Sequence, residues 1–216
     1  MAFKLTLQNW IALKEELKGE YNDFNDKVTG KFVWQIFTWD AANDSAREFA
    51  LEDWYDYHIT PRKEKVKQVL INMQAKAESL GFNYDKVKIY KMLLVRLGNI
   101  WYGVAAEHIV IDYLNSLEGI KCKHESSEVD KEYKVDAVIY VDGKEFAIQV
   151  KTEAYKHYDD GKEYGMHSMY TEKFGRRVFY LYYNLDITGI ILNETRISMV
   201  NKDQIIQLIK KIAVYC

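Results

Sequence analysis

Three polar side chains stand in a stretch that otherwise alternates like a half-buried β-hairpin. The stretch is VDAVIYVDGKEFAIQVKT, and the three side chains are Asp136, Gln149 and Lys151. Its central Asp-Gly pair predicts a two-residue type I′ turn, because that turn needs positive φ at both central residues. The turn sets a register in which Asp136 lies directly opposite Gln149, with Lys151 two residues further along the same face. Opposed Cβ atoms lie about 4.5–5.5 Å apart, so a carboxylate, an amide and an ammonium are expected to converge.

The same register predicts that the alternate residues of the hairpin form one apolar face packed on the core. The expected cross-strand pairs are Val141 with Lys144, Ile139 with Phe146, Ala137 with Ile148, and Val135 with Val150.

A carboxylate beside an amide oxygen can hold Mg²⁺, which prefers hard oxygen ligands. A lysine next to them can orient or deprotonate an attacking water and can offset the charge of a phosphate. These are the parts that metal-assisted phosphodiester hydrolysis needs. The same residues are also consistent with a solvated sheet face on which Asp136 and Lys151 simply pair, because both residue types are common on exposed faces.

The elements after about residue 101 must position these groups. The pattern predicts a helix ending at Gly119, a strand in IKCKHE, the hairpin, a helix near MHSMYTEKF and a strand in RVFYLYYN. A further strand pair is expected in ITGIILN and RISMV, and a closing helix in KDQIIQLIKKIAVY. This order indicates an α/β fold with a mixed sheet flanked by helices.

The pattern before residue 98 is mainly helical. We expect a helix in LQNWIALKEELKGE, a second beginning at Asn43 or Asp44, a third capped by Thr60 and ended by Gly81, and a fourth stopped by Gly98. The sequence therefore predicts two parts: residues 1–98, a helical region suited to DNA binding or dimerisation, and residues 99–216, the α/β core.

The amino-acid composition limits the classes of protein to which the chain can belong. The chain has 216 residues, 48% of them hydrophobic, and a formal net charge of −2, so any nucleic-acid contact must rest on local positive charge. Two cysteines give neither a zinc spacing nor a disulfide framework. The opening MAFKLTLQNW is not expected to act as a signal peptide, and no apolar run reaches the roughly 18 residues of a membrane helix. We expect a soluble, cytoplasmic protein that does not contact membranes.

Asp136, followed after twelve residues by Gln149-Val150-Lys151, resembles the signature of the PD-(D/E)XK nuclease superfamily. The predicted order of helix, three strands, helix and strand is similar to the superfamily core. Many members carry a glutamate on the helix before the sheet, and Glu107 matches it, in the apolar stripe of its own helix. A carboxylate there is costly without a partner. Two departures stand out: valine precedes Asp136 where the signature has proline, and glutamine replaces the commoner glutamate, a variant similar to that of Mrr-like restriction endonucleases.

The resemblance implies a restriction-endonuclease-like core and a Mg²⁺ cofactor. It makes Asp136 the main metal ligand, Gln149 a second and the Val150 carbonyl a third. Lys151 would act on the attacking water, and Glu107 would bind metal or orient water.

The activity that follows from the resemblance is a Mg²⁺-dependent Type II restriction endonuclease that acts on double-stranded DNA as a homodimer. Three alternatives stay open. One is a structure-specific nuclease, either a junction resolvase or a repair enzyme. Another is a DNA-binding module whose nuclease site has lapsed. The third is a helical scaffold in which the aspartate–lysine pair is structural.

The long segment after the lysine strand mixes basic residues with tyrosines, which suits contact with phosphates and bases. Its candidate DNA contacts are Lys156, Lys162, His167, Lys173, Arg176 and Arg177. A polar surface connection explains the same composition. The basic helical segment 62–96 has the same two interpretations, a phosphate-binding surface or a solvated helix face.

Overall fold

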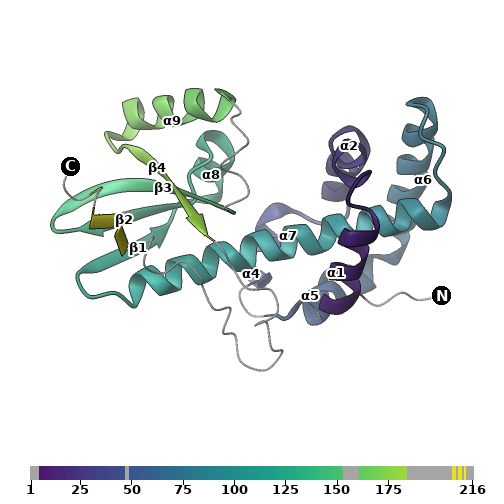
Figure 1. Ribbon diagram of the computed structural model, residues 1–216, viewed down its shortest axis with the longest axis horizontal. Helices are drawn as coiled ribbons and strands as arrows, with labels where there is room; N and C mark the ends of the chain where they lie inside the picture. Colours follow the sequence, from purple (N-terminus) through teal and green to yellow (C-terminus); the bar gives the residue numbers. More distant parts are fainter. Residues whose placement is uncertain are drawn as a thin grey trace. The chain divides into compact units, whose positions relative to one another are not determined.

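The computed structural model describes residues 5–46, 49–152 and 161–183 and, near the C-terminus, residues 206, 207, 209, 210 and 212. The chain divides into two compact units, Met1–Ala105 and Ala106–Cys216 (Figure 1). The long helix α7 (Lys86–Asn115) contributes to both, and the boundary expected after residue 98 falls inside it. The strand pair expected in ITGIILN and RISMV lies outside the described residues, whereas the described residues of the expected closing helix are helical.

The first unit is helical throughout its described part. Besides the start of α7, its elements are α1 (Leu7–Glu16), α2 (Tyr21–Phe24), the π-helical turn η1 (Asn25–Thr29), α3 (Gly30–Phe32), the 3-10 turn η2 (Val33–Gln35), α4 (Trp39–Ala46), α5 (Leu51–His58), the 3-10 turn η3 (Thr60–Arg62) and α6 (Lys63–Ser79). Large side chains fill its core, among them Trp10, Phe24, Trp54, Met73 and Met92.

Three helix predictions in this unit are wrong. Thr60 does not cap α6, which begins at Lys63 after the turn η3, and its hydroxyl donates instead to Oδ1 of Asp56 at 3.1 Å. The helix expected to begin at Asn43 or Asp44 is divided into α4 and α5. The break expected at Gly98 does not occur, because α7 continues through it. The glycine serves close packing instead: a Cβ at Gly98 would lie 2.3 Å from Cδ1 of Trp10. Gly81, by contrast, ends α6 with a φ of +80°, as the sequence predicts.

The second unit is an α/β layer structure. Its strands are β1 (Ile120–His124), β2 (Ala137–Val141), β3 (Lys144–Thr152) and β4 (Val178–Tyr183), and its further helices are α8 (Ser127–Tyr133) and α9 (Gly161–Phe174). The sheet order is β1-β2-β3-β4, with antiparallel pairs at β1–β2 and β2–β3 and a parallel pair at β3–β4. Figure 1 shows α8 and α9 over one face of the sheet and the last turns of α7 along the other. The predicted mixed sheet flanked by helices is confirmed.

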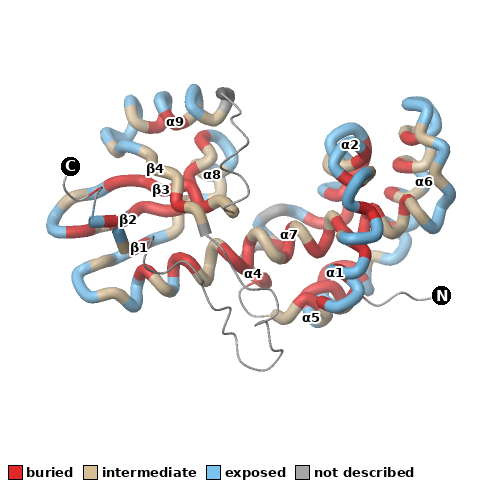
Figure 2. Tube along the Cα trace, in the orientation of Figure 1, coloured by how far each residue is buried: buried red, intermediate tan, exposed pale blue. Residues whose placement is uncertain are grey.

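The hairpin register follows from its turn as predicted. Asp142 and Gly143 both have positive φ, 50° and 78°. The pairs Val141–Lys144, Ile139–Phe146 and Ala137–Ile148 are present. Buried residues run along both strands, with Phe146 to Val150 all buried, so β3 is covered on both faces (Figure 2).

The fourth predicted pair is wrong, because Val135 does not face Val150. It packs instead with Tyr133, Ala147 and Tyr170, on the face that α8 and α9 cover. The reason is α8, a helix that the charged sequence after β1 did not predict. It ends at Lys134 in the left-handed conformation, φ 58°, and the chain enters β2 from that turn.

Candidate active site

Asp136 is fixed just before β2 by both its backbone and its side chain. Its backbone N–H donates to the carbonyl of Ile148 at 3.0 Å. Its carboxylate Oδ2 accepts the backbone N–H of Val150 at 2.5 Å. The left-handed turn at Lys134 precedes it, and the Lys134 carbonyl lies 3.2 Å from Nε2 of His167 on α9. The aspartate is therefore held against the stretch of β3 that carries Gln149 and Lys151.

Gln149 is the anomaly of the sheet. Its side chain is 1% exposed. Among the residues that the structure describes, its Oε1 has no hydrogen-bond partner. A buried acceptor left unsatisfied costs about 1–3 kcal/mol, and buried polar atoms in folded proteins are nearly always paired. An oxygen in this state is available to a ligand that the described residues do not supply.

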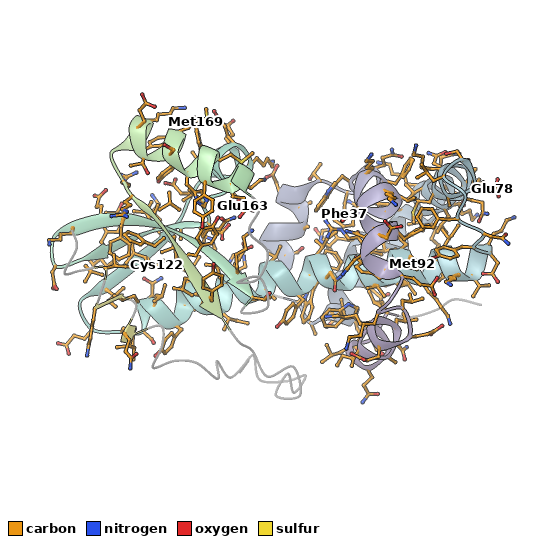
Figure 3. The ribbon with its side chains drawn as sticks, turned by 45° about the horizontal axis from the view of Figure 1, so that its top comes forward. Phe37, Glu78, Met92, Cys122, Glu163 and Met169 are labelled. Carbon is orange, nitrogen blue, oxygen red and sulfur yellow. The ribbon has the colours of Figure 1, made fainter. Side chains whose placement is uncertain are left out.

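Lys151 lies two residues further along β3 and is ion-paired. Its Nζ is 3.4 Å from Oε1 of Glu163 on α9, and both side chains are largely buried, at 22% and 13% exposure. The other oxygen of Glu163 accepts the Tyr180 hydroxyl at 3.1 Å. Figure 3 shows Glu163 between α9 and the sheet. The glutamate thus fixes the lysine over the face that carries Gln149.

Sequence analysis missed Glu163, because it stands at the start of a helix expected to begin a few residues later. One signal could have found it. Glu163, His167 and Tyr170 are spaced by four and three residues, which places them on one face of a helix. His167 and Tyr170 are buried, so that face is the inner face of α9.

Glu107 lies on α7, in a stripe whose neighbours Val104, Ile111 and Leu114 are all buried. Burial raises the pKa of Glu107 well above its usual value, and the nearby Asp136 carboxylate raises it further. The ionisation of Glu107 is therefore coupled electrostatically to that of Asp136.

The Asp136 carboxyl is perturbed in the same direction. Burial raises its pKa from 3.8 to about 7, and the Asp130 and Glu163 carboxylates add to the shift. The Val150 N–H and the Lys151 ammonium act in the opposite direction but do not cancel it. Too little positive charge lies near Glu107 and Asp136 to stabilise their ionised forms.

The donor set fits a hard divalent cation. Two carboxyls with raised pKa and one unsatisfied amide oxygen offer the oxygen ligands that Mg²⁺ takes. A cation beside them would favour both ionised carboxylates and would satisfy Gln149 Oε1. In the described part of the chain, no group of three or more histidine, cysteine, aspartate or glutamate side chains is placed to hold a metal ion. A metal ion at this place would therefore need Gln149 and backbone oxygen as ligands.

The candidate DNA contacts are not gathered at this site. Lys156 lies outside the described residues, and Lys162 is the second residue of α9, its side chain not described. His167 is buried. Lys173 donates to the Tyr133 hydroxyl at 2.9 Å, and Arg177 is exposed, 5.4 Å over the Phe179 ring.

Arg176 has two acidic partners among the described residues. Its Nε lies 2.7 Å from Oε2 of Glu145, six residues before Lys151 on β3. Its Nη1 lies 3.9 Å from Oε1 of Glu125, whose backbone N–H donates to the Asp136 carbonyl at 3.0 Å. Lys173, Arg176 and Arg177 thus contact protein side chains, and DNA binding by them stays a prediction.

The basic segment in the first unit is partly neutralised. Lys67 pairs with Glu64 within α6. Two lysines of α7 pair with glutamates at the end of α1 and just after it, Lys91 with Glu16 at 2.5 Å and Lys88 with Glu20 at 2.6 Å. These contacts favour the interpretation as a solvated helix face.

No protein-family model matches the chain, and neither a curated protein nor a solved structure is significantly similar to it. The helices that the structure describes include none that is both long enough and apolar enough to span a membrane. The resemblance to PD-(D/E)XK nucleases therefore rests on the residues and geometry above.

Proposed function

We propose that the protein is a Mg²⁺-dependent endonuclease that hydrolyses DNA phosphodiester bonds, with a PD-(D/E)XK-type site on a restriction-endonuclease-like core. One observation carries the proposal. Gln149 buries an oxygen without a partner on the strand that holds Asp136 and Lys151. A structural aspartate–lysine pair does not explain that oxygen, whereas a cation ligand does.

The residues that would hold the cation are Asp136, Gln149 through Oε1, the Val150 carbonyl and Glu107. A bound Mg²⁺ supplies charge stabilisation at a phosphate and a more acidic water. Lys151 is held by Glu163, so its ammonium is fixed in place, and we assign it to orienting the attacking water and offsetting phosphate charge. Glu107 orients water or completes the ligand set.

Two versions of this proposal differ in the DNA that the enzyme would cleave. The first is cleavage of double-stranded DNA at a specific sequence by a symmetric homodimer, as in a Type II restriction enzyme of the cytoplasm. The second is a structure-specific nuclease. The tyrosines beside Lys151, Tyr180 and Tyr182 with the exposed Tyr164 next to them, favour the second version.

The first test is cleavage of long DNA by the purified protein, with Mg²⁺ and with EDTA. We expect cleavage only with Mg²⁺. Discrete fragments indicate sequence specificity, and branched or single-strand-containing substrates test the second version. If every DNA is bound and none is cut, the site has lapsed and the proposal is wrong.

Two variants separate chemistry from folding. Asp136→Asn keeps an oxygen that can accept the Val150 N–H but removes the charge, and we expect cleavage to fall by at least about 100-fold. Asp142→Asn is the matched control, because it makes the same substitution in the hairpin turn, where asparagine suits the positive φ of 50°. Equal activity of Asp136→Asn and wild type would refute the assignment.

A further inference from the structure

Three tyrosines form a row beside the candidate site, which we call the tyrosine row: Tyr164, Tyr180 and Tyr182. The Tyr180 and Tyr182 rings are stacked along one face of β4, with centroids 5.9 Å apart and an interplanar angle of 11°. Tyr164 on α9 meets Tyr180 at 6.3 Å in an edge-on arrangement. The parallel register pairs Tyr180 with Gln149 and Tyr182 with Lys151. Paired residues on adjacent strands point to the same face, so the row lies next to the site.

The row is tied to the site and is partly open to solvent. Tyr180 donates its hydroxyl to Glu163, the carboxylate that also pairs with Lys151. The ring of His167, which is buried, lies 5.2 Å from Tyr180 on the inner side. Tyr164 leaves 59% of its surface exposed. A fixed inner ring and an exposed outer ring together make a platform onto which another flat ring can stack.

An unpaired nucleobase fits this platform better than a duplex does. In an intact duplex, the base faces are stacked inside the helix, and a protein meets mainly phosphates, through cations and other donors. Aromatic rings bind a nucleic acid where a base face is accessible, which requires an unpaired nucleotide. Arg176 and Lys173, which suit phosphates, are engaged by Glu145, Glu125 and the Tyr133 hydroxyl, whereas the tyrosines stand beside Lys151.

We infer that the tyrosine row binds an unpaired base adjacent to the scissile phosphate, so that the substrate is DNA with a single-stranded segment. This inference rests on the proposed nuclease function, because Lys151 marks the reacting phosphate. It names the substrate class of that site: single strands, or duplexes with flaps, overhangs or gaps.

The test measures binding separately from cleavage. Fluorescein-labelled oligonucleotides of one sequence are titrated with the full chain in Ca²⁺, as a single strand, as a blunt duplex and as a duplex with a flap. We expect the single strand and the flap to bind at least about tenfold more tightly than the blunt duplex. Tyr164→Ala and Tyr182→Ala should each weaken binding of the single strand by about 5- to 100-fold. Tyr164→Phe and Tyr182→Phe keep the ring and should bind like wild type.

The chain offers a matched control in Tyr57, which is also 59% exposed but lies on α5 in the first unit. Tyr57→Ala should leave binding of every oligonucleotide unchanged. Equal affinity for duplex and single strand, or alanine variants of the row that bind like Tyr57→Ala, would overturn the inference. Thermal melts of each variant separate a lost contact from a lost fold.

The same panel distinguishes failure of the inference from failure of the proposed function. Mg²⁺-dependent cleavage of blunt duplex that Tyr164→Ala leaves intact would refute the row and preserve the nuclease. Binding that depends on the row without cleavage of any DNA would refute the nuclease. A single-stranded RNA of the same sequence completes the panel, and tighter binding of RNA than of DNA would refute DNA as the substrate while retaining the unpaired base.

Discussion

Replacing Asp136 by asparagine should stabilise the metal-free protein at neutral and alkaline pH. Burial raises the pKa of this carboxyl from 3.8 to about 7, so ionising it in the folded state is unfavourable. A difference of about three pH units corresponds to about 4 kcal/mol at about 1.4 kcal/mol per unit. Asparagine carries no charge and retains an acceptor for the Val150 N–H, which the carboxylate accepts at 2.5 Å.

The sign of the pH dependence follows from the raised pKa. Below pH 3.8 the carboxyl is protonated in the folded and the unfolded chain. As the pH rises from about 4 to about 7, only the unfolded chain ionises, and the wild type loses stability relative to the variant. The variant should therefore match the wild type near pH 4 and exceed it by up to about 4 kcal/mol at pH 8. For a chain of this length, that difference corresponds to about 10 °C in Tm.

The assay is thermal and urea unfolding in EDTA across this pH range, for wild type, Asp136→Asn and the turn control Asp142→Asn. The control should follow the wild-type curve at every pH. Wild-type and Asp136→Asn curves that stay parallel from pH 4 to pH 8 would show that Asp136 ionises normally in the folded protein. In that case the surrounding protein would already stabilise the ionised carboxylate, and the raised pKa would no longer support a bound cation.

Three further predictions use the same unfolding assay. Saturating Mg²⁺ or Ca²⁺ should raise the Tm of the wild type, since a ligand at 100 times its Kd contributes about 2.7 kcal/mol. The Gln149→Met variant should lose most of that increase in Tm. If its Tm rises as much as that of the wild type, Gln149 is not a ligand. Gly98→Ala should destabilise the protein by about 1–3 kcal/mol or more, because the new methyl overlaps the indole of Trp10 packed against α7. Gly103→Ala in the same helix is the control: its methyl meets nothing within 4 Å, so this variant should be neutral or stabilising. Burial lowers the pKa of His58 below 6.5, so the stability of the folded protein should fall as the pH drops below that value. The Asp136→Asn variant is used for this measurement because it lacks the pH dependence that Asp136 contributes. A stability of this variant that does not change with pH would contradict the prediction.

The sequence was sufficient for the hairpin because its signals are local. A two-residue Asp-Gly turn leaves few registers, and alternation selects the one that buries Ile139 and Phe146. The same register predicted Asp136 directly opposite Gln149, and the structure does not contain that pair: the ladder begins at Ala137–Ile148, and the Asp136 N–H donates to the Ile148 carbonyl. The entry into β2 was not accessible in the same way, since it depends on α8 and on Lys134, a non-glycine residue in the left-handed region. This entry moves Val135 to the other face, and the Asp136 carboxylate lies against the Val150 N–H.

Glu163 and the tyrosine row were missed for a related reason. They come from α9 and β4, which reach the site only through a parallel crossover. The spacing of Glu163, His167 and Tyr170 places them on one helix face but does not tell which strand residues that face meets. The composition of the segment drew attention to its lysines and arginines instead. The structure engages two of those in contacts with protein side chains, Lys173 with Tyr133 and Arg176 with Glu145 and Glu125.

Gly98 and Gln149 are both locally unfavourable residues, for different reasons. Gly98 sits in the middle of α7, where glycine is unfavourable, but the ring of Trp10 occupies the space that a side chain would need, so the protein itself accounts for it. Gln149 buries an amide oxygen in a strand, and no described residue accounts for it. A residue that is unfavourable for stability, and whose cost no packing contact offsets, is typical of functional sites. The unsatisfied oxygen lies on the strand that carries Lys151 and next to the backbone N–H that binds Asp136, so the ligand it lacks is best sought where the two carboxyls also need positive charge.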